Sequence, residues 1–488
     1  MHFFPAKSAR LIDAGTGCVL DSSAIQRHVN QWQIILQSYQ GQRVVLTADS
    51  SISWILVDLA CLTAGILLTP LPGYLSETQR SAVLTRLQPD LWLSDCEIDD
   101  DACTLLEERH GLLLYRRRVN AAVAVAPGTQ KITFTSGSTG DPKGVCLSGD
   151  GQLDVAQALK ARVELISSGC PRHLCLLPLP TLLENIAGVY APLLAGGEVI
   201  VASDTIRGFV GSRLTKPHAL LQLISAQQPK SLILVPELLK MLVQAAIKGW
   251  QVPASLEFIA VGGAYVSPDL LKTAAALGLP VYQGYGLSEC GSVVALSGTV
   301  PAQATDSVGL PLACRDVQII DGELVVNTPF LGYLGEPDSA AQQVYTGDLA
   351  EWTAQGGLRI SGRRKNLLIN SFGRNISPEW VETALTDSGV IQQAMLLGDA
   401  QPYCTALLYA AADISDVQLA AAVQQVNQQL PDYATVVNFH RLATPFCPTQ
   451  GTLTENGRLR RSCIEQRYAS QISALFTGEQ YELLSIPA

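Results

Sequence analysis

One stretch in the first third of the chain indicates the fold: Phe134-Thr135-Ser136-Gly137-Ser138-Thr139-Gly140-Asp141-Pro142-Lys143-Gly144. It holds three glycines, four hydroxyl residues and one lysine, and it begins within the apolar, β-branched run Lys131-Ile132-Thr133-Phe134, which predicts a short strand. Glycines leave backbone N–H groups exposed, and hydroxyls and an ammonium add donors, so the stretch is suited to binding phosphate oxygens. It is not the common nucleotide P-loop, because Pro142 stands where that pattern has its second glycine. A plain Gly/Ser surface loop is the alternative interpretation.

The composition predicts a multi-domain globular protein. The chain has 488 residues, 48% hydrophobic and 16% charged, which allows large buried cores and suggests two to four domains. The formal net charge of −10 argues against non-specific nucleic-acid binding. The basic clusters are short and typical of solvated faces or small anion contacts; they lie at 116–118, 363–365 and 458–461.

The twelve cysteines and six histidines do not predict a metal cage or a disulfide framework, because no cysteine pair has CxxC spacing. This usage indicates a reducing, cytoplasmic compartment. Met1–Gly15 lacks the basic-then-apolar plan of a signal peptide. The most apolar run, 54–71, contains Asp58 and Pro70 and is expected to be a buried helix followed by a strand, so no membrane span is predicted.

Helical and extended patterns alternate through the first three quarters of the chain, which predicts α/β layers around largely parallel sheets. The helical patterns are expected at 25–39, 54–64, 154–165, 220–227 and 238–250. The extended patterns are expected at 43–46, 66–71, 173–177, 198–202, 231–235 and 258–261.

A change of character near Gly362 predicts a second, smaller domain. Before it lie short strand patterns at 324–326 and 358–360. After it, helical patterns at 378–388 and 416–430 mix with strand patterns at 394–397 and 405–410. We therefore predict an N-terminal domain over 1–362, a C-terminal α+β domain over 363–488, and a hinge near Lys365.

A second motif is Tyr282-Gln283-Gly284-Tyr285-Gly286-Leu287-Ser288-Glu289, which follows Gly262-Gly263-Ala264. Alone it is also compatible with a tight turn and a helix N-cap. Placed after the phosphate loop, it resembles the aromatic-Gly-x-Thr/Ser-Glu motif of the adenylate-forming (AMP-binding) superfamily, whose phosphate loop the 134–144 stretch also resembles. That superfamily includes acyl-CoA synthetases, adenylation domains and luciferases.

The resemblance implies roles for these residues. Tyr285 is expected to stack on adenine, Ser288 to bond the α-phosphate or the acyl carboxylate, and Glu289 to hold Mg²⁺, for which carboxylate oxygen is a suitable ligand. The nucleotide contacts implied in these motifs are Thr135, Ser136, Gly137, Ser138, Thr139, Gly140, Lys143, Gly262, Gly263, Ala264, Tyr285, Gly286 and Ser288.

The third motif is Tyr345-Thr346-Gly347-Asp348, followed by Gly362-Arg363. A lone Thr-Gly-Asp is equally an ordinary turn. In the superfamily, the Asp at the position of Asp348 accepts hydrogen bonds from the ribose hydroxyls and the Arg at the position of Arg363 also reaches the ribose. Lys365 occupies the position of the family hinge. The segment 369–378, with Glu379 and Glu382 behind it, resembles the glycine turn and helix start of the small domain, which approaches the pantetheine arm.

Two positions depart from the family pattern. Thr181, in Pro178-Leu179-Pro180-Thr181, stands where many relatives have a histidine that lines the acyl pocket. Arg458, in Asn456-Gly457-Arg458-Leu459, stands where relatives have the lysine that bridges the acyl carboxylate and the α-phosphate. Arginine keeps the charge but is planar and bulkier. The departures leave three possibilities for adenylation: slower, reshaped, or lost.

The fold implied is a large N-terminal domain of layered α/β sheets with a smaller, mobile α+β C-terminal domain. The function implied is ATP- and Mg²⁺-dependent activation of a carboxylic acid, fatty or otherwise apolar, to an acyl-adenylate, followed by transfer to CoA or to the phosphopantetheine of a carrier protein acting in trans. The implied catalytic residues are Lys143, Ser288, Glu289 and Arg458. A nucleotide-binding pseudoenzyme and a stand-alone adenylation enzyme of secondary metabolism are the alternatives.

Overall fold

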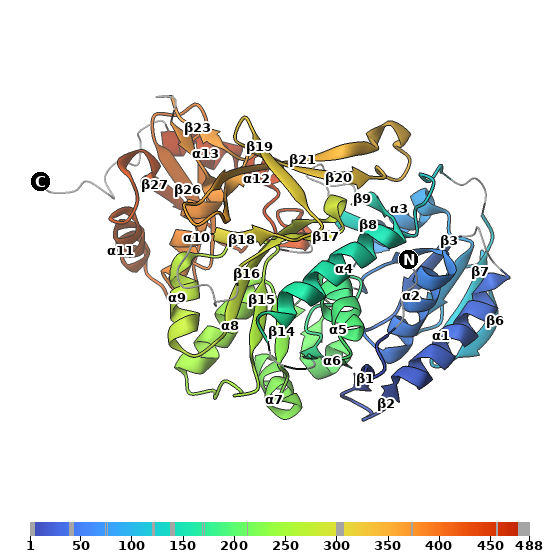
Figure 1. Ribbon diagram of the computed structural model, residues 1–488. Helices are drawn as coiled ribbons and strands as arrows, with labels where there is room; N and C mark the ends of the chain where they lie inside the picture. The colour runs from blue at the N-terminus through green and yellow to red at the C-terminus, as the bar shows by residue number, and fades with distance from the viewer. Residues whose placement is uncertain are drawn as a thin grey trace, which may run out of the picture.

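The computed structural model describes the chain except residues 1–4, 39–42, 74, 76, 120–122, 137–141, 168, 170, 212, 299–306, 372–373, 455–456 and 477–488. It is a mixed α/β protein with two large sheets in its N-terminal part and a smaller C-terminal unit (Figure 1). Within the described residues, no helix has both the length and the apolar composition needed to cross a bilayer.

The first large sheet has seven strands and carries the predicted phosphate loop at one edge. Its strands, in spatial order, are β6 (Cys103–Arg109), β7 (Leu112–Arg117), β5 (Leu91–Ser94), β3 (Arg43–Thr47), β4 (Leu67–Pro70), β8 (Lys131–Ser136) and β9 (Pro142–Leu147). Strands β3, β4, β5 and β8 run parallel, and β8 turns back into β9 as an antiparallel pair with Phe134 opposite Gly144. The loop therefore joins two strands of a hairpin rather than a strand and a helix.

The second large sheet has thirteen strands. In spatial order they are β19 (Asp316–Ile320), β20 (Glu323–Phe330), β21 (Ala341–Trp352), β22 (Leu358–Arg363), β18 (Ser307–Pro311), β17 (Ser292–Leu296), β16 (Val281–Leu287), β15 (Phe258–Val261), β14 (Ser231–Leu234), β10 (Arg172–Leu174), β11 (Glu198–Val201), β1 (Arg10–Asp13) and β2 (Val19–Asp21).

The expectation of largely parallel sheets holds only for the middle of this second sheet. In the spatial order of the sheet, each neighbouring pair in the run β1, β11, β10, β14, β15 and β16 is parallel. Each neighbouring pair in the run β16, β17, β18, β22, β21, β20 and β19 is antiparallel. The physical reason is visible between β19 and β20, where the two-residue turn Asp321-Gly322 has positive φ angles of 49° and 77°. Such a turn closes a hairpin and leaves no room for a crossover helix.

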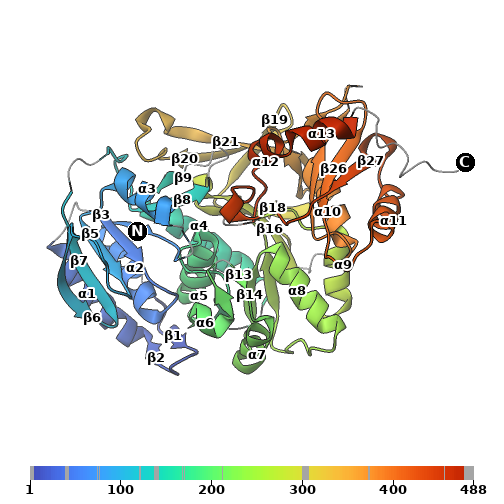
Figure 2. The ribbon, with the colours of Figure 1, turned by 180° about the vertical axis from the view of Figure 1, so that it is seen from behind.

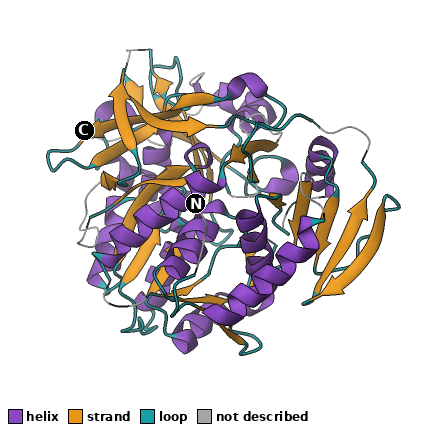
Figure 3. Cartoon of the chain, turned by 45° about the vertical axis from the view of Figure 1, so that its right-hand side comes forward, coloured by secondary structure: helices purple, strands orange, loops and turns teal. Residues whose placement is uncertain are grey.

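Helices cover and separate the two sheets (Figure 3). They are α1 (Ser22–Gln37), α2 (Ile52–Ala64), α3 (Glu77–Leu87), α4 (Gly149–Glu164), α5 (Ala191–Leu194), α6 (Asp204–Arg207), α7 (Pro217–Gln227), α8 (Pro236–Ile247) and α9 (Pro268–Ala276). Helix α2 is apolar on all sides and almost wholly buried, as the predicted buried helix requires. One core cluster joins α2, α4, β5 and β17, so the two sheets share it. The smaller elements here are the hairpin β12 (Phe209–Val210) and β13 (Arg213–Leu214), and three short helices, η1 (Glu184–Tyr190), η2 (Ser288–Cys290) and η3 (Pro337–Ser339).

A buried ionic network ties three of these elements together. The Lys131 ammonium at the start of β8 lies 2.8 Å from a carboxylate oxygen of Asp58 in α2 and donates to Asn185 and Tyr190 in η1, a π-helix. Tyr190 and Asn185 also donate to Asp58, at 2.5 and 2.8 Å. Burial lowers the pKa of Lys131, while the Asp58 carboxylate raises it. Because each charge has several partners, the network can fix the strand that leads into the phosphate loop.

The C-terminal unit has a separate core. Its elements are β23 (Leu368–Ile369), β24 (Asn375–Ile376), α10 (Pro378–Asp387), β25 (Gln393–Leu397), β26 (Cys404–Tyr409), α11 (Asp416–Asn427), η4 (Asp432–Ala434), β27 (Val436–Arg441), η5 (Pro448–Gln450), α12 (Arg461–Arg467) and α13 (Ala469–Phe476). Two clusters made only of residues after 367 pack on the two faces of the β25–β26–β27 sheet. Figure 2 shows α13 beside this sheet, and Figure 1 shows the unit next to α8 and α9.

Candidate functional site

Two residues predicted to bind the nucleotide, Tyr285 of the second motif and Asp348 of the third, are in contact in the thirteen-stranded sheet. The phenol of Tyr285, at the end of β16, donates a 2.5 Å hydrogen bond to Oδ2 of Asp348 in β21. The guanidinium Nε of Arg363, in the neighbouring strand β22, lies 2.9 Å from the other carboxylate oxygen, and Asp348 and Arg363 are register partners. An aromatic ring, a buried carboxylate and a cation are therefore held together.

The environment of Asp348 changes its acidity. Burial raises the pKa of the Asp348 carboxyl above its ordinary value, and the Arg363 charge and the Tyr285 hydrogen bond oppose that rise. Burial, and then the nearby Asp348 carboxylate, raise the pKa of Tyr285, so its phenol stays protonated and acts as the donor. The carboxylate keeps acceptor capacity for further hydroxyl groups, which is the chemistry a vicinal diol requires.

Arg458 reaches this site from the C-terminal unit. Its Nη2 donates a 2.8 Å hydrogen bond to the carbonyl oxygen of Gly263, which follows β15. The residue keeps an exposed surface, but crowding by protein atoms, and then the charge of Arg363, lower the pKa of its guanidinium, while Asp348 and Glu289 raise it. A guanidinium remains charged despite such a shift. The structure thus places a C-terminal cation among the predicted nucleotide residues.

Glu289 and Lys143 share a partner that the sequence did not single out. Oε1 of Glu289, in η2, accepts a 2.9 Å hydrogen bond from the phenol of Tyr333, and Nζ of Lys143 lies 4.7 Å from the centre of the same ring. Lys143 also lies 3.7 Å from Glu336. Burial, followed by the Glu289 carboxylate, raises the pKa of Tyr333, which therefore donates. The only sequence signal for Tyr333 is its place in Gly332-Tyr333, between two turn-forming glycines at 332 and 335.

The remaining predicted contacts lie close to these groups along the chain. Gly262 and Gly263 follow β15 directly, and Gly263 has φ of +87°, which favours glycine. Gly286 lies in β16 where an added Cβ would come within 1.9 Å of the Ser292 carbonyl oxygen, so only glycine fits the β16–β17 pairing. Ser288 opens η2 and is half-buried, and Ala264 is exposed.

Four residues of the predicted phosphate loop, Gly137, Ser138, Thr139 and Gly140, lie outside the described residues, as do the side chains of Thr135 and Ser136. The backbone of the last two extends β8, opposite Lys143 and Pro142 of β9. The glycine turn at 372–373 in the small domain is likewise outside the described part of the chain.

The predicted hinge residue lies between two anchored neighbours. Arg364 donates to the Asp321 carbonyl oxygen at 2.8 Å and lies 3.6 Å from Glu323, both next to the β19–β20 turn. Asn366 instead donates at 2.5 Å to Glu379 of α10. Lys365 is exposed, and no side-chain partner of Lys365 is found among the described residues. The side chains on either side of Lys365 thus contact different units.

Thr181 lies in the turn before η1, where its N–H bonds the Pro178 carbonyl oxygen. The following π-helix is a feature that the sequence pattern did not predict. It carries Glu184, whose Oε1 lies 2.7 Å from Nε2 of His173, with Cys175 nearby. His173 also contacts Ser231 Oγ through Nδ1 at 3.0 Å. Since both ring nitrogens are engaged, this buried group is better described as a structural polar pair than as a metal site.

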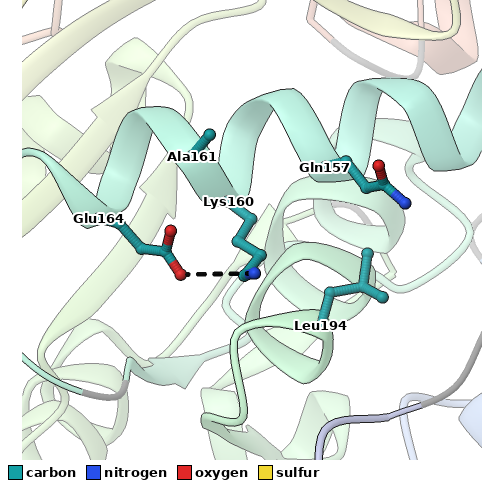
Figure 4. Close-up of a pocket in the computed structure, with 5 residues that line it drawn as sticks. All are labelled: Gln157, Lys160, Ala161, Glu164 and Leu194. Atoms are coloured by element: carbon teal, nitrogen blue, oxygen red, sulfur yellow. Dashed lines mark ion pairs between the residues drawn. The ribbon is translucent and has the colours of Figure 1, made fainter.

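A shallow surface pocket lies between α4 and α5, away from these residues. Figure 4 shows Lys160 and Glu164 along α4, joined by a 3.7 Å ion pair, with Leu194 of α5 facing them. None of the predicted nucleotide residues lines it. An exposed pair one helical turn apart is an ordinary surface feature, so this pocket has no part in the candidate site.

Comparison with family models covers most of the chain. Residues 33–334 match the model of the AMP-binding enzymes, and residues 365–480 match the model of the AMP-binding enzyme C-terminal domain.

Curated relatives include two kinds of CoA ligase. The chain is 29% identical over 254 residues to long-chain-fatty-acid–CoA ligase FadD15 of Mycobacterium bovis, with 45% of this chain and 42% of that protein covered. The chain thus aligns with less than half the length of this relative. It is 26% identical over 476 residues to 2-succinylbenzoate–CoA ligase of Staphylococcus aureus, with 88% and 91% covered.

Solved structures share the fold. An O-succinylbenzoate coenzyme A synthetase (MenE) from Bacillus subtilis, in complex with AMP, matches with a TM-score of 0.72 at 19% identity, covering 94% of this chain and 95% of that one. The anthranilate CoA ligase AuaEII matches with a TM-score of 0.74 at 14% identity, covering 96% and 95%. These likenesses confirm a large N-terminal domain with a smaller C-terminal domain.

Proposed function

Because this chain belongs to the AMP-binding enzyme family, we propose that it is an AMP-forming acid–thiol ligase. It activates a carboxylic acid with ATP, releases pyrophosphate and passes the acyl group from the adenylate to a thiol. The main support for the proposal is the hydrogen bond between Arg458 and the Gly263 carbonyl oxygen, close to Asp348 and Glu289. This contact brings a cation from the C-terminal unit to the residues proposed to bind the nucleotide.

In the first step a carboxylate oxygen attacks the α-phosphorus of ATP, and the bond to the pyrophosphate oxygen breaks. Tyr285 offers its ring to the adenine, and Asp348 accepts from the ribose hydroxyls with Arg363 beside it. Arg458 supplies positive charge where negative charge builds up between carboxylate and phosphate. These groups act by positioning and by electrostatic stabilisation.

The acidic residue Glu289 fits a magnesium site. Oε1 accepts from Tyr333, and Oε2 has no hydrogen-bond partner among the described residues, so one carboxylate oxygen is available. Mg²⁺ commonly binds one or two carboxylates together with substrate phosphates, and when bound it neutralises phosphate charge. Lys143 and the loop 137–140 are proposed to hold the phosphates.

In the second step, a thiol must reach the acyl carbon of the adenylate. We propose an N-terminal domain over 1–362 and a C-terminal domain over 363–488 that rotates about Lys365, the position between Arg364, anchored in one unit, and Asn366, anchored in the other. Rotation withdraws Arg458 and lets a thiol approach, attack the acyl carbon and release AMP. CoA is the acceptor we propose, because the relatives carry CoA ligase names; a carrier protein acting in trans is the alternative acceptor.

The acid we propose is either a fatty acid or an aromatic acid. The fatty-acid choice is supported by FadD15 and by the Pro178-Leu179 segment followed by the buried Glu184. The aromatic choice is supported by the 2-succinylbenzoate ligases, whose alignment covers 91% of the relative. A stand-alone adenylation enzyme of secondary metabolism would share the first step and differ in its partner.

A nucleotide-binding pseudoenzyme is the second candidate, and Arg458 is the observation that favours it. The planar guanidinium of arginine differs in shape from the compact ammonium of a lysine. Against it stand the complete set Glu289, Asp348 and Arg363, since a protein released from catalysis has no need of the metal ligand.

The test is pyrophosphate release from Mg-ATP across panels of fatty, aryl and amino acids, with and without CoA. Release with one acid class supports ligase chemistry and names the class, and acceleration by CoA identifies the acceptor. Lys143→Ala and Glu289→Gln should each lower adenylate formation. Release that is unchanged in either variant would contradict the site assignment, and no release from any acid, with ATP still bound, would favour the pseudoenzyme.

A further inference from the structure

A short segment, Gly332–Leu334, runs beside β9, the strand that carries Lys143. The Cys146 N–H donates to the Gly332 carbonyl oxygen at 3.0 Å, the Leu334 N–H donates to the Gly144 carbonyl oxygen at 2.8 Å, and Tyr333 pairs with Val145 in an antiparallel bridge. An added Cβ on Gly144 would lie 3.1 Å from the Leu334 side chain, a tight contact, so the two segments approach each other closely here. The backbone thus fixes Tyr333 relative to Lys143.

The Tyr333 side chain then joins two groups from distant parts of the chain. Its phenol donates to Glu289 Oε1 at 2.9 Å, while its ring lies 4.7 Å below the Lys143 ammonium. The ring of Phe330 packs edge-on against it, with centroids 5.1 Å apart. Backbone pairing on one side and a packed ring on the other hold the phenol in one direction.

We propose that Tyr333 is a positioning residue for nucleotide binding: its hydroxyl orients the Glu289 carboxylate toward the cation, and its ring places the Lys143 ammonium toward the phosphates. The inference rests on the proposed function and adds a residue to it. A hydroxyl that donates to one carboxylate oxygen leaves the other oxygen available to a metal ion, and removal of such partners of metal ligands commonly changes metal affinity about 10–100-fold. A cation over an aromatic face is attracted by the electrons of the ring.

The other partner of Lys143 is less suited to this task. Glu336 lies 3.7 Å from Lys143 and 3.6 Å from Arg86, and its side chain is 40% exposed. Exposed ion pairs of this length contribute little. A carboxylate would also repel phosphate, whereas the neutral ring of Tyr333 holds the ammonium without competing for it. Tyr333 therefore offers the more effective support for a phosphate-binding lysine.

The experiment removes the hydroxyl and keeps the ring. ATP binding to Tyr333→Phe is measured by calorimetry with Mg²⁺ and with a chelator, and Mn²⁺ binding to the protein–ATP complex by electron paramagnetic resonance. We expect the metal concentration for half-saturation to rise about tenfold, with metal-free ATP binding unchanged. Tyr409→Phe, in the C-terminal unit, is the control and should leave both unchanged. A Tyr333→Phe protein with wild-type metal dependence, or with equal losses with and without metal, would overturn the inference.

A second variant separates this inference from the proposed function. If Glu289→Gln raises the metal requirement and Tyr333→Phe does not, Tyr333 is only structural and the metal assignment stands. If neither changes it, the metal assignment itself is wrong. If both act through one carboxylate, the double variant should be no worse than Glu289→Gln alone. Tyr333→Leu, which removes the ring as well, should in addition weaken metal-free ATP binding, because Lys143 loses its support.

Discussion

The guanidinium Nη2 of Arg458 donates a 2.8 Å hydrogen bond to the carbonyl oxygen of Gly263, a residue 195 positions away. The contact brings the end of the C-terminal unit onto the loop after β15, beside Asp348 and Glu289. One amino group of the Arg458 guanidinium is thus held by the backbone of the N-terminal unit. The arrangement of the two units seen here is therefore the one we assign to adenylation.

Replacement of Arg458 should separate charge from geometry. Arg458→Ala should slow pyrophosphate release about 10²–10³-fold, equivalent to about 2.7–4 kcal/mol, because a placed charge is lost. Arg458→Lys should preserve or raise the rate. Single-turnover pyrophosphate release measures both, and Arg467→Ala, at the exposed end of α12, is the control. An inactive Arg458→Lys would mean that the arginine has a role that the family pattern does not supply.

The raised pKa of Asp348 predicts a pH dependence of ATP binding. Because the folded-state pKa lies above the ordinary aspartate value of about 3.9, the carboxyl becomes protonated at a higher pH than an ordinary aspartate. Protonation removes the acceptor for the ribose hydroxyls, so ATP affinity should fall as pH drops through the raised pKa. Calorimetry across that range tests this. Asp348→Asn should bind ATP weakly, and its affinity should not fall further in this pH range. If the fall in affinity persists in Asp348→Asn, another group causes it.

The same shift has a consequence for stability with the opposite direction. A carboxyl whose pKa is raised in the folded state binds more protons there than in the unfolded chain. Its contribution to the free energy of unfolding is therefore present below the unfolded pKa and is lost as pH rises through the folded pKa. We therefore expect the free energy of unfolding of the wild type to fall relative to that of Asp348→Asn as the pH rises from the unfolded pKa to the folded pKa. Urea denaturation of both proteins across this pH range measures the difference.

The buried pair in α2 and β8 predicts a large stability effect. Lys131→Met leaves the Asp58 carboxylate buried without its cation and should cost about 3–5 kcal/mol in the free energy of unfolding. The double variant Asp58→Leu/Lys131→Met should recover much of that loss. Urea denaturation measures both, and Lys160→Met, in the exposed α4 pair, should cost at most about 1 kcal/mol. Equal losses in the single and double variants would argue against the charge explanation.

A contact between the two units predicts a shift between the half-reactions. Lys240 in α8 lies 3.1 Å from Asp387 at the end of α10 and donates to Thr386 at 3.4 Å. Lys240→Ala should weaken the arrangement seen here by up to about 1 kcal/mol, so adenylation should slow up to about fivefold while thioester formation does not. Lys272→Ala, which breaks an exposed pair on α9, is the control. Equal slowing of both half-reactions would place the effect elsewhere.

Local sequence predicted several of the helices and strands. The helix predicted at 54–64 is α2, the strand predicted at 258–261 is β15, and the helix predicted at 378–388 is α10. Each has a physical signal within its own residues: an apolar run behind the N-cap Ser51, β-branched residues before Gly262-Gly263, and a proline at the first helical turn. The Asp321-Gly322 hairpin turn was readable too, although the prediction of parallel sheets overlooked it.

The motif residues could be predicted from the sequence, because each is a residue type that one expected chemical task needs: a ring for a base, carboxylates for a diol and a cation, and glycines for close approach. Only the tertiary structure decided which of them meet. Tyr333 has only the neighbouring glycines as a sequence signal, and the role we propose for it rests on a hydrogen bond to Glu289 and a ring contact with Lys143, which are 44 and 190 positions away. Arg458 likewise reaches Gly263 only because the C-terminal unit lies against the N-terminal one. Local preferences set each element, whereas contacts across the chain depend on how separately formed elements pack, and no short window of sequence carries that information.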